Sequence, residues 1–212
     1  IDTGTRIGTV VSFLNSAAWS GAVKPAEAPV GNRAAKALKD AIIEFSDDLG
    51  FAPLVSDSRG DRFTMRAAVV LHEASLSAPN EKIDVSGLIG LGIGLTPSGD
   101  DFVTGALLAE AVFADNRNSA LGRILDRSLL QDALSRTVPA GRTLLFGALK
   151  EQFPEYLLEV GRAIAGHIQG GNIRSAIAAA SHHGATSGID SCAGVWWYLD
   201  RVLKRQSGFR FH

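Results

Sequence analysis

The chain has 212 residues, of which 46% are hydrophobic, with a formal net charge of −1 and a single cysteine. This composition supplies a buried core, lacks the basic excess of a nucleic-acid groove and excludes an internal disulfide framework. The longest glycine-rich apolar run, residues 87–95, is shorter than the roughly 20 residues of a membrane helix. No signal peptide is recognised at Ile1, so we expect a cytoplasmic protein that binds neither nucleic acid nor membrane.

The first 32 residues differ in pattern from the rest. Residues 5–14 are β-branched and partly alternating, which predicts a strand. Prolines and glycines over residues 17–32 indicate an irregular connection. We therefore predict an N-terminal strand and irregular segment over 1–32 and a helical domain over 33–212. The expected fold class is mainly α, a multi-helix domain with a small N-terminal β element.

Apolar residues at helical spacing predict seven or so helices after residue 33. Asp61 is placed to cap one of them, and Pro139 suits the first turn of another. Gly50 and the glycines at 170 and 171 are placed to end helices. The predicted helical segments are 34–49, 62–76, 98–114, about 119–134, 139 to about 153, 154–170 and 187–204, and residues 172–183 are alanine-rich.

The most specific stretch is residues 87–109, in which glycine-rich backbone leads into the start of a helix. The free N–H groups of a first helical turn and the positive end of the helix dipole suit a small anion. Asp100 and Asp101 place two carboxylates on that first turn.

The pattern S-G-x-D-x-x-x-G of residues 98–105 returns at residues 187–194. A threonine precedes each copy, and an apolar helix follows each. In both copies the serine is expected to cap the helix while the aspartate three residues later reaches back, as in a capping box. The serine, aspartate and final glycine share one helix face, because positions three, four and seven residues apart lie on the same side.

Two interpretations of this repeat stay open. In the first, the helices simply cross closely at Gly105 and Gly194, where a missing side chain lets two backbones approach. Alternatively, both helix starts line one site. A glycine inside a helix costs about 0.5–1 kcal/mol relative to alanine, so both glycines need a reason, and Asp100 is not needed for a cap. Adjacent carboxylates also suit a hard cation such as Mg²⁺.

Other motifs are excluded. No lysine follows the glycines as in a Walker A loop, and residues 90–95 do not fit G-x-G-x-x-G. The adjacent His182 and His183 splay apart on a helix and lack further ligands at metal spacing. Cys192 is expected to be a buried small hydrophobe rather than a nucleophile.

The first motif contains Gly92, the segment Gly94 to Ser98, Asp100 and Asp101, and the second contains Gly184, Thr186 to Gly188 and Asp190. Together the two motifs resemble the AllH-like family. That family includes a subunit of oxamate carbamoyltransferase from anaerobic allantoin degradation, a part of purine catabolism. Two departures matter. Ala185 stands where the family has a histidine, and members carry a longer, mostly strand-like N-terminal portion. The resemblance covers roughly residues 85–206.

The resemblance implies carbamoyl transfer between carbamoyl phosphate and oxamate or a related acid, in a complex with partner subunits that include an FdrA-like protein. Both substrates are small anions, which agrees with a site at two helix starts. A non-catalytic docking subunit is the alternative. No cofactor is assigned with certainty. The hypothesis gives catalytic roles to Asp100, Asp101 and Asp190 and substrate contacts to Gly94, Thr96, Ser98, Gly99, Thr186, Ser187 and Gly188.

Overall fold

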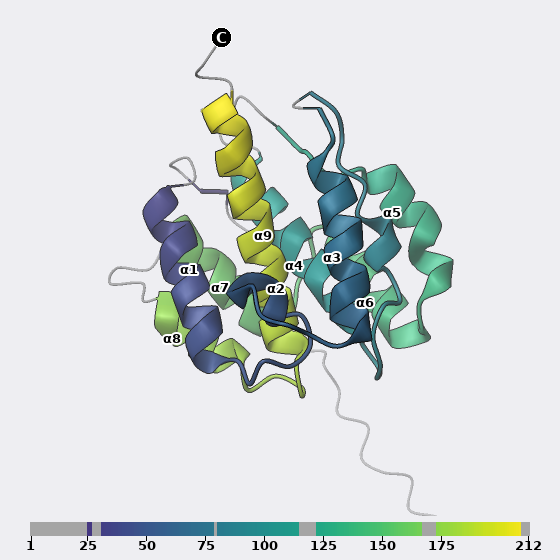
Figure 1. The fold of residues 1–212 in the computed structure, drawn as a ribbon, viewed down its shortest axis with the longest axis horizontal. Helices are drawn as coiled ribbons and strands as arrows, with labels where there is room; N and C mark the ends of the chain where they lie inside the picture. The colour runs from purple at the N-terminus through teal and green to yellow at the C-terminus, as the bar shows by residue number, and fades with distance from the viewer. Residues whose placement is uncertain (1–24, 27–30, 79, 115–121, 167–172, 209–212) are drawn as a thin grey trace, which may run out of the picture.

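The computed structural model describes residues 25–26, 31–78, 80–114, 122–166 and 173–208 (Figure 1). Within these ranges the mainly α prediction is confirmed, and no strand is formed beyond an isolated parallel bridge between Ile83 and Leu125. The strand predicted over 5–14 lies outside the described residues. The helices are α1 (Asn32–Phe45), α2 (Pro53–Ser56), α3 (Arg62–Ser75), α4 (Ser98–Phe113), α5 (Arg127–Ala133), α6 (Pro139–Leu149), α7 (Glu155–Ala165), α8 (Ile173–Ala180) and α9 (Ser187–Gly208), with 3₁₀ turns η1 (Ser86–Leu88) and η2 (Leu134–Arg136).

Helix α4 lies at the centre of the fold (Figure 1). It packs against α9, α6 and α7, while α1 packs against α8 and α9. Every residue of α4 from Gly99 to Phe113 is buried, as expected for a helix that is apolar on nearly all sides. The two helices that carry the repeated motif therefore form the core, and the other helices surround them.

Local sequence signals fix several helix starts. The Asp61 carboxylate accepts hydrogen bonds from the backbone N–H groups of Phe63 and Thr64 and so caps α3 as predicted. Pro139 occupies the first turn of α6, where its missing N–H costs nothing. Helices α4 and α9 begin at Ser98 and Ser187, the serines of the two motifs.

Three predicted helix ends were too late, among them that of α6, which ends at Leu149 rather than near residue 153. Helix α1 ends at Phe45 rather than near Leu49, because the following turn carries Phe51 into the core. Asp48 and Gly50 have positive φ angles of 53° and 59° in that turn, and Phe51 is fully buried. Helix α7 ends at Ala165, earlier than the predicted glycines at 170 and 171, because the next residue, Gly166, takes the left-handed conformation with a φ of 76°.

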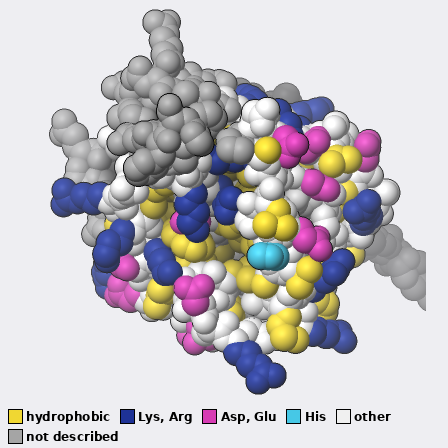
Figure 2. Space-filling model, turned by 45° about the horizontal axis from the view of Figure 1, so that its top comes forward, with side chains coloured by type: hydrophobic (Ala, Val, Ile, Leu, Met, Phe, Trp, Pro, Cys, Tyr) yellow, Lys and Arg dark blue, Asp and Glu magenta, His cyan; other side chains and the backbone are white. Residues whose placement is uncertain are grey.

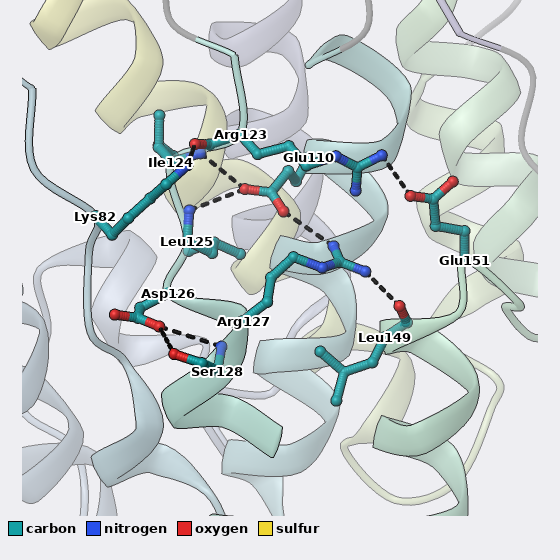
Figure 3. Close-up of polar contacts among 10 residues, drawn as sticks. All are labelled: Lys82, Glu110, Arg123, Ile124, Leu125, Asp126, Arg127, Ser128, Leu149 and Glu151. Carbon is teal, nitrogen blue, oxygen red and sulfur yellow. Dashed lines mark hydrogen bonds and ion pairs between the residues drawn. The ribbon is translucent and has the colours of Figure 1, made fainter. Parts of the chain in front are cut away.

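The helix predicted over 119–134 is also too long, since α5 begins only at Arg127. Just before α5, Ile124 and Leu125 are bound to the buried Glu110 of α4 (Figure 3). Glu110 Oε1 accepts hydrogen bonds from the N–H groups of Ile124 and Leu125, each at 2.9 Å. Its Oε2 pairs with Arg127 at 3.0 Å. A contact distant in sequence thus overrides the helical periodicity of this segment.

Candidate functional site

The starts of α4 and α9 lie together. Thr96, two residues before α4, and Ser187, the first residue of α9, have their hydroxyl oxygens 3.0 Å apart. The contact joins positions 91 residues apart in the chain. The structure therefore brings the two S-G-x-D motifs into one place.

The two helices touch through their motif glycines. A Cβ atom on Gly105 would lie 1.8 Å from the carbonyl oxygen of Ser191, and one on Gly194 would lie 1.9 Å from that of Phe102. Gly105 occupies the same position in its motif as Gly194, and Phe102 the same as Ser191, so the contact is reciprocal. Close backbone packing is thus one reason for both glycines, as the first of the two interpretations expected.

The aspartates also act reciprocally, each toward the other motif. The hydroxyl of Ser187 lowers the pKa of Asp101, and that of Ser98 lowers the pKa of Asp190. The predicted capping box in α4 is wrong: the residue before the helix is Pro97, and no side chain caps the helix end. The motif thus links two helices instead of closing one.

Two of the first-turn amides that were expected to face an anion are already bonded. The N–H of Gly99 donates to the carbonyl of Leu91 at 2.8 Å, and the N–H of Gly188 donates to that of His183 at 3.0 Å. Neither glycine has space for a side chain, because a Cβ atom would lie within 2 Å of a backbone carbonyl oxygen. These two residues pack the helix starts against the preceding segments.

Asp101 and Asp190 form a buried carboxyl pair beneath the helix starts. Their side chains are 1% and 0% exposed, and the Oδ2 atom of each has no hydrogen-bond partner. Asp190 Oδ1 accepts the N–H of Phe51 at 2.6 Å. A buried polar atom without a partner is rare in folded proteins. The two orphaned oxygens are therefore the most unusual feature of this region.

Burial dominates the acidity of this pair. It raises the pKa of Asp101 to about 8, with hydrogen bonds from Ser187 and Thr96 lowering the pKa and the negative charge of Asp190 raising it. It raises the pKa of Asp190 to about 6, against the lowering effect of hydrogen bonds from Phe51, Thr186 and Ser98. Burial therefore favours the protonated form of both carboxyl groups, and more strongly for Asp101 than for Asp190.

Asp100 has different partners. Its Oδ1 accepts the N–H of Gly90 at 2.7 Å, and its Oδ2 accepts the hydroxyl of Thr137. A Cβ atom on Gly141 would lie 1.9 Å from Oδ2. Burial raises the pKa of Asp100, and the two hydrogen bonds lower it. Asp100 therefore ties the glycine-rich segment to the start of α6, with both oxygens bonded to protein groups.

Four hydroxyl groups from the predicted set lie half-buried at the two helix starts, nearer the surface than the carboxyl pair; they belong to Thr96, Ser98, Thr186 and Ser187. Gly94 is exposed, with a φ of 101° that favours glycine. It lies between Ile93 and Leu95, whose side chains are 79% and 81% exposed. The surface of the site is thus hydroxyl-rich and flanked by an apolar loop.

Sequence reasoning missed two residues of this region. Phe51 supplies the N–H group that binds Asp190. The hydroxyl of Tyr156 lies 3.3 Å from that of Ser191, and burial raises the pKa of Tyr156 to about 12. The Tyr156 ring also stacks on His183, with ring centroids 4.3 Å apart. Nothing in the local sequence marks either residue, since both reach the site from elements distant in the chain.

The described residues contain no group of three or more His, Cys, Asp or Glu side chains arranged to hold a metal ion. Cys192 is fully buried, and burial raises the pKa of its thiol far above the usual range, as expected for a packing residue. Among the described helices, none combines the length and apolar character of a membrane span.

Comparison with protein families places these motifs in a known context. The model of the family described as oxamate carbamoyltransferase subunit AllH matches residues 88–199, just over half of the chain. The matched range begins before α4 and ends within α9, so it includes both motifs. Searches of the curated proteins and of the solved structures found no match.

Proposed function

The chain belongs to the AllH family of oxamate carbamoyltransferase subunits, and we propose that it binds small anionic substrates, carbamoyl phosphate or oxamate, where α4 and α9 begin. The family description names a subunit, so we expect activity only with partner subunits, for which an FdrA-like protein is the candidate. The biological context would be allantoin degradation within purine catabolism.

One observation carries the proposal: two buried carboxyl groups, Asp101 and Asp190, each keep an oxygen without a partner. Leaving a buried polar atom unsatisfied costs about 1–3 kcal/mol. Perturbed carboxyl groups with such a cost cluster at functional sites. The half-buried hydroxyls of Thr96 and Ser187 would contact the substrate and connect it to the pair.

The proposed chemistry is direct transfer. The acceptor nitrogen attacks the carbamoyl carbon, the bond from that carbon to the phosphate oxygen breaks, and phosphate leaves. Protonated Asp101 would donate a hydrogen bond to an oxygen that gains negative charge, and ionised Asp190 would take the proton lost by the nitrogen. The hydroxyls would align the reactants, so no covalent intermediate with the protein is required.

Isothermal titration tests this proposal. Carbamoyl phosphate, inorganic phosphate and oxamate are titrated, with and without Mg²⁺, into the isolated chain and into the complex with its partner subunits. We expect saturable heat from at least one of these anions in the complex. If none of the three gives heat in either preparation, the ligand-site proposal is wrong.

Two isosteric variants test the carboxyl pair. We expect Asp101→Asn and Asp190→Asn to abolish transfer in the complex while the melting temperature falls only modestly. Asp40→Asn, on the exposed face of α1, is the control and should keep full activity. Full activity in both motif variants would overturn the proposed roles.

A non-catalytic docking subunit is the second candidate. The close contact of α4 and α9 at Gly105 and Gly194 favours it, because the motif has a packing role even without a ligand. On this view Asp101→Asn and Asp190→Asn would impair folding, and any variant chain that still folded and assembled would leave the complex active.

A further inference from the structure

A separate cavity opens between α2, α3 and α9. Its volume is about 530 Å³, within the range of roughly 300–1,000 Å³ typical of small-molecule sites. None of the motif residues Thr96, Ser98, Asp101, Ser187 and Asp190 lines it. Any ligand that it takes is therefore distinct from the anion proposed for the helix starts.

The inner wall of this cavity is aromatic. Phe102 and Trp197 line it and are only 1% and 7% exposed, and their rings lie 5.9 Å apart at an angle of 51°. Trp196 also lines the cavity and is half-buried. Aromatic walls of this kind favour a flat apolar group, because stacking and edge contacts add to the hydrophobic effect.

The rim of the cavity is basic. Arg59, Arg201 and Lys204 line it, and Figure 2 shows Lys and Arg side chains beside hydrophobic ones on the face where α3 and α9 lie in front. Lys204 is neutralised by Asp200 at 2.7 Å, and the cavity residue Asp57 by Lys39 at 3.6 Å.

The two arginines lack carboxylate partners among the described residues. Arg201 donates to the backbone carbonyl of Ser75 at 3.3 Å, and its buried Nε has no partner. Arg59 is exposed and forms no ion pair within the described part of the chain. The cavity thus keeps two unneutralised guanidinium groups, which bind carboxylate and phosphate groups well.

We propose that this cavity binds a small molecule with a flat aromatic part and one anionic group. The ring lies against Trp196 and Trp197, and the anionic group meets Arg59 and Arg201. A carboxylate and a phosphate ester both satisfy this chemistry, so the test includes one probe of each kind.

The test is a fluorescence titration of the full chain, read from its tryptophans, with 1-naphthoate, adenosine monophosphate and the neutral 1-naphthalenemethanol. We expect saturable quenching by one of the anionic probes and weaker binding of the neutral one. Binding of naphthoate alone would assign an aryl carboxylate, and binding of the nucleotide alone a phosphate ester. Equal binding of the neutral probe, or no saturable binding at all, would overturn the proposal.

Variants locate the binding. Arg59→Gln and Arg201→Gln should each weaken binding of the anionic probe about tenfold or more, as expected when a charged hydrogen bond is lost. Arg66→Gln, exposed on α3 and not part of the cavity lining, is the matched control and should leave the affinity unchanged. Ala68→Phe, at the cavity wall, should block binding. Equal affinities for all four variants would overturn the assignment, while the titration of carbamoyl phosphate tests the helix-start site independently.

Discussion

Helix α4 buries carboxylates near both of its ends, and these carboxylates differ in their hydrogen-bond partners. Glu110, near the end of the helix, is fully buried, and both of its oxygens are bonded, to two backbone N–H groups and to Arg127 (Figure 3). Asp101, in the first turn, is equally buried, yet its Oδ2 has no partner. The same helix therefore contains two satisfied buried carboxyl groups, Glu110 and Asp100, and one unsatisfied group, Asp101.

The difference separates a structural role from a proposed functional one. A buried charge that only holds the fold together needs partners, because desolvation is costly. Glu110 obtains them from the segment that it holds in place. Asp101 and Asp190 keep free oxygens at the junction of two helices, where a ligand would supply what the protein does not.

The largest expected effect is at Glu110. Glu110→Ala leaves the N–H groups of Ile124 and Leu125 and the guanidinium of Arg127 without their acceptor. We expect a loss of about 3–5 kcal/mol in the free energy of unfolding, typical of breaking one side of a buried ion pair, measured by chemical denaturation. The exposed Asp40, which pairs with Lys36 on α1, is the control, and Asp40→Ala should cost less than about 1 kcal/mol. Similar losses for both variants would contradict the structural role.

The second effect is at the crossing of α4 and α9. Gly105→Ala places a Cβ atom 1.8 Å from the carbonyl oxygen of Ser191, so one backbone must shift. Overpacking of this kind typically costs about 1–3 kcal/mol, visible as a lower melting temperature. Gly161→Ala is the control, since its Cβ would meet only the ends of Leu108 and Val112 side chains at 3.3 Å or more, and it should change stability little. A tolerated Gly105→Ala would mean that the close contact is not required.

The sequence predicted those parts of the fold that are governed by local signals. Asp61 and Pro139 act within a few residues of themselves, so the starts of α3 and α6 were predicted correctly. The start of α5 was not, because Glu110 holds residues 124 and 125 from another element. The helical spacing of apolar residues before α5 reflects which side chains are buried and does not indicate a helix.

The candidate site was predictable only in part for the same reason. The repeat of S-G-x-D indicated that Ser98 and Ser187 belong together. The exchange of partners between the motifs was missed, because a serine three residues before an aspartate fits a local capping box equally well. The partners of Asp190 and Ser191, Phe51 and Tyr156, come from distant elements, which no pattern near the motifs reveals.

The stability of the chain should depend on pH through Asp101. Burial raises the pKa of Asp101 from 3.8 to about 8, so the folded chain holds a proton that the unfolded chain releases near pH 4. The bound proton stabilises the folded chain, and this stabilisation is complete below about pH 4 and is lost as the pH rises to about 8. For one such group, the free energy of unfolding changes by at most about 1.4 kcal/mol per pH unit.

Asp101→Asn removes this dependence. The free energy of unfolding of the variant, measured by denaturant titration, should fall less than that of the parent between pH 6 and 8. Asp190→Asn should flatten the curve mainly below pH 6, because the pKa of Asp190 is about 6. Curves parallel to the parent in both variants would show that the pair is not perturbed by burial.

The smallest effect is at Asp126, which caps α5 beside the Glu110 network (Figure 3). Its Oδ1 accepts the N–H groups of Ser128 and Leu129, and the hydroxyl of Ser128 at 2.7 Å is the main reason that its pKa is lowered. Asp126→Ala should cost about 1 kcal/mol, and Asp126→Asn, which keeps an acceptor, only a few tenths. The sign of the pH effect is opposite to that of Asp101: the capping contribution is present above the ordinary pKa of 3.8 and is lost as the pH falls below it. Denaturation curves at several pH values give the loss of unfolding free energy caused by Asp126→Ala and by Asp101→Asn. If the two losses change in opposite directions with pH, a satisfied carboxylate is distinguished from an unsatisfied one. Slopes of the same sign would contradict this difference between the two groups.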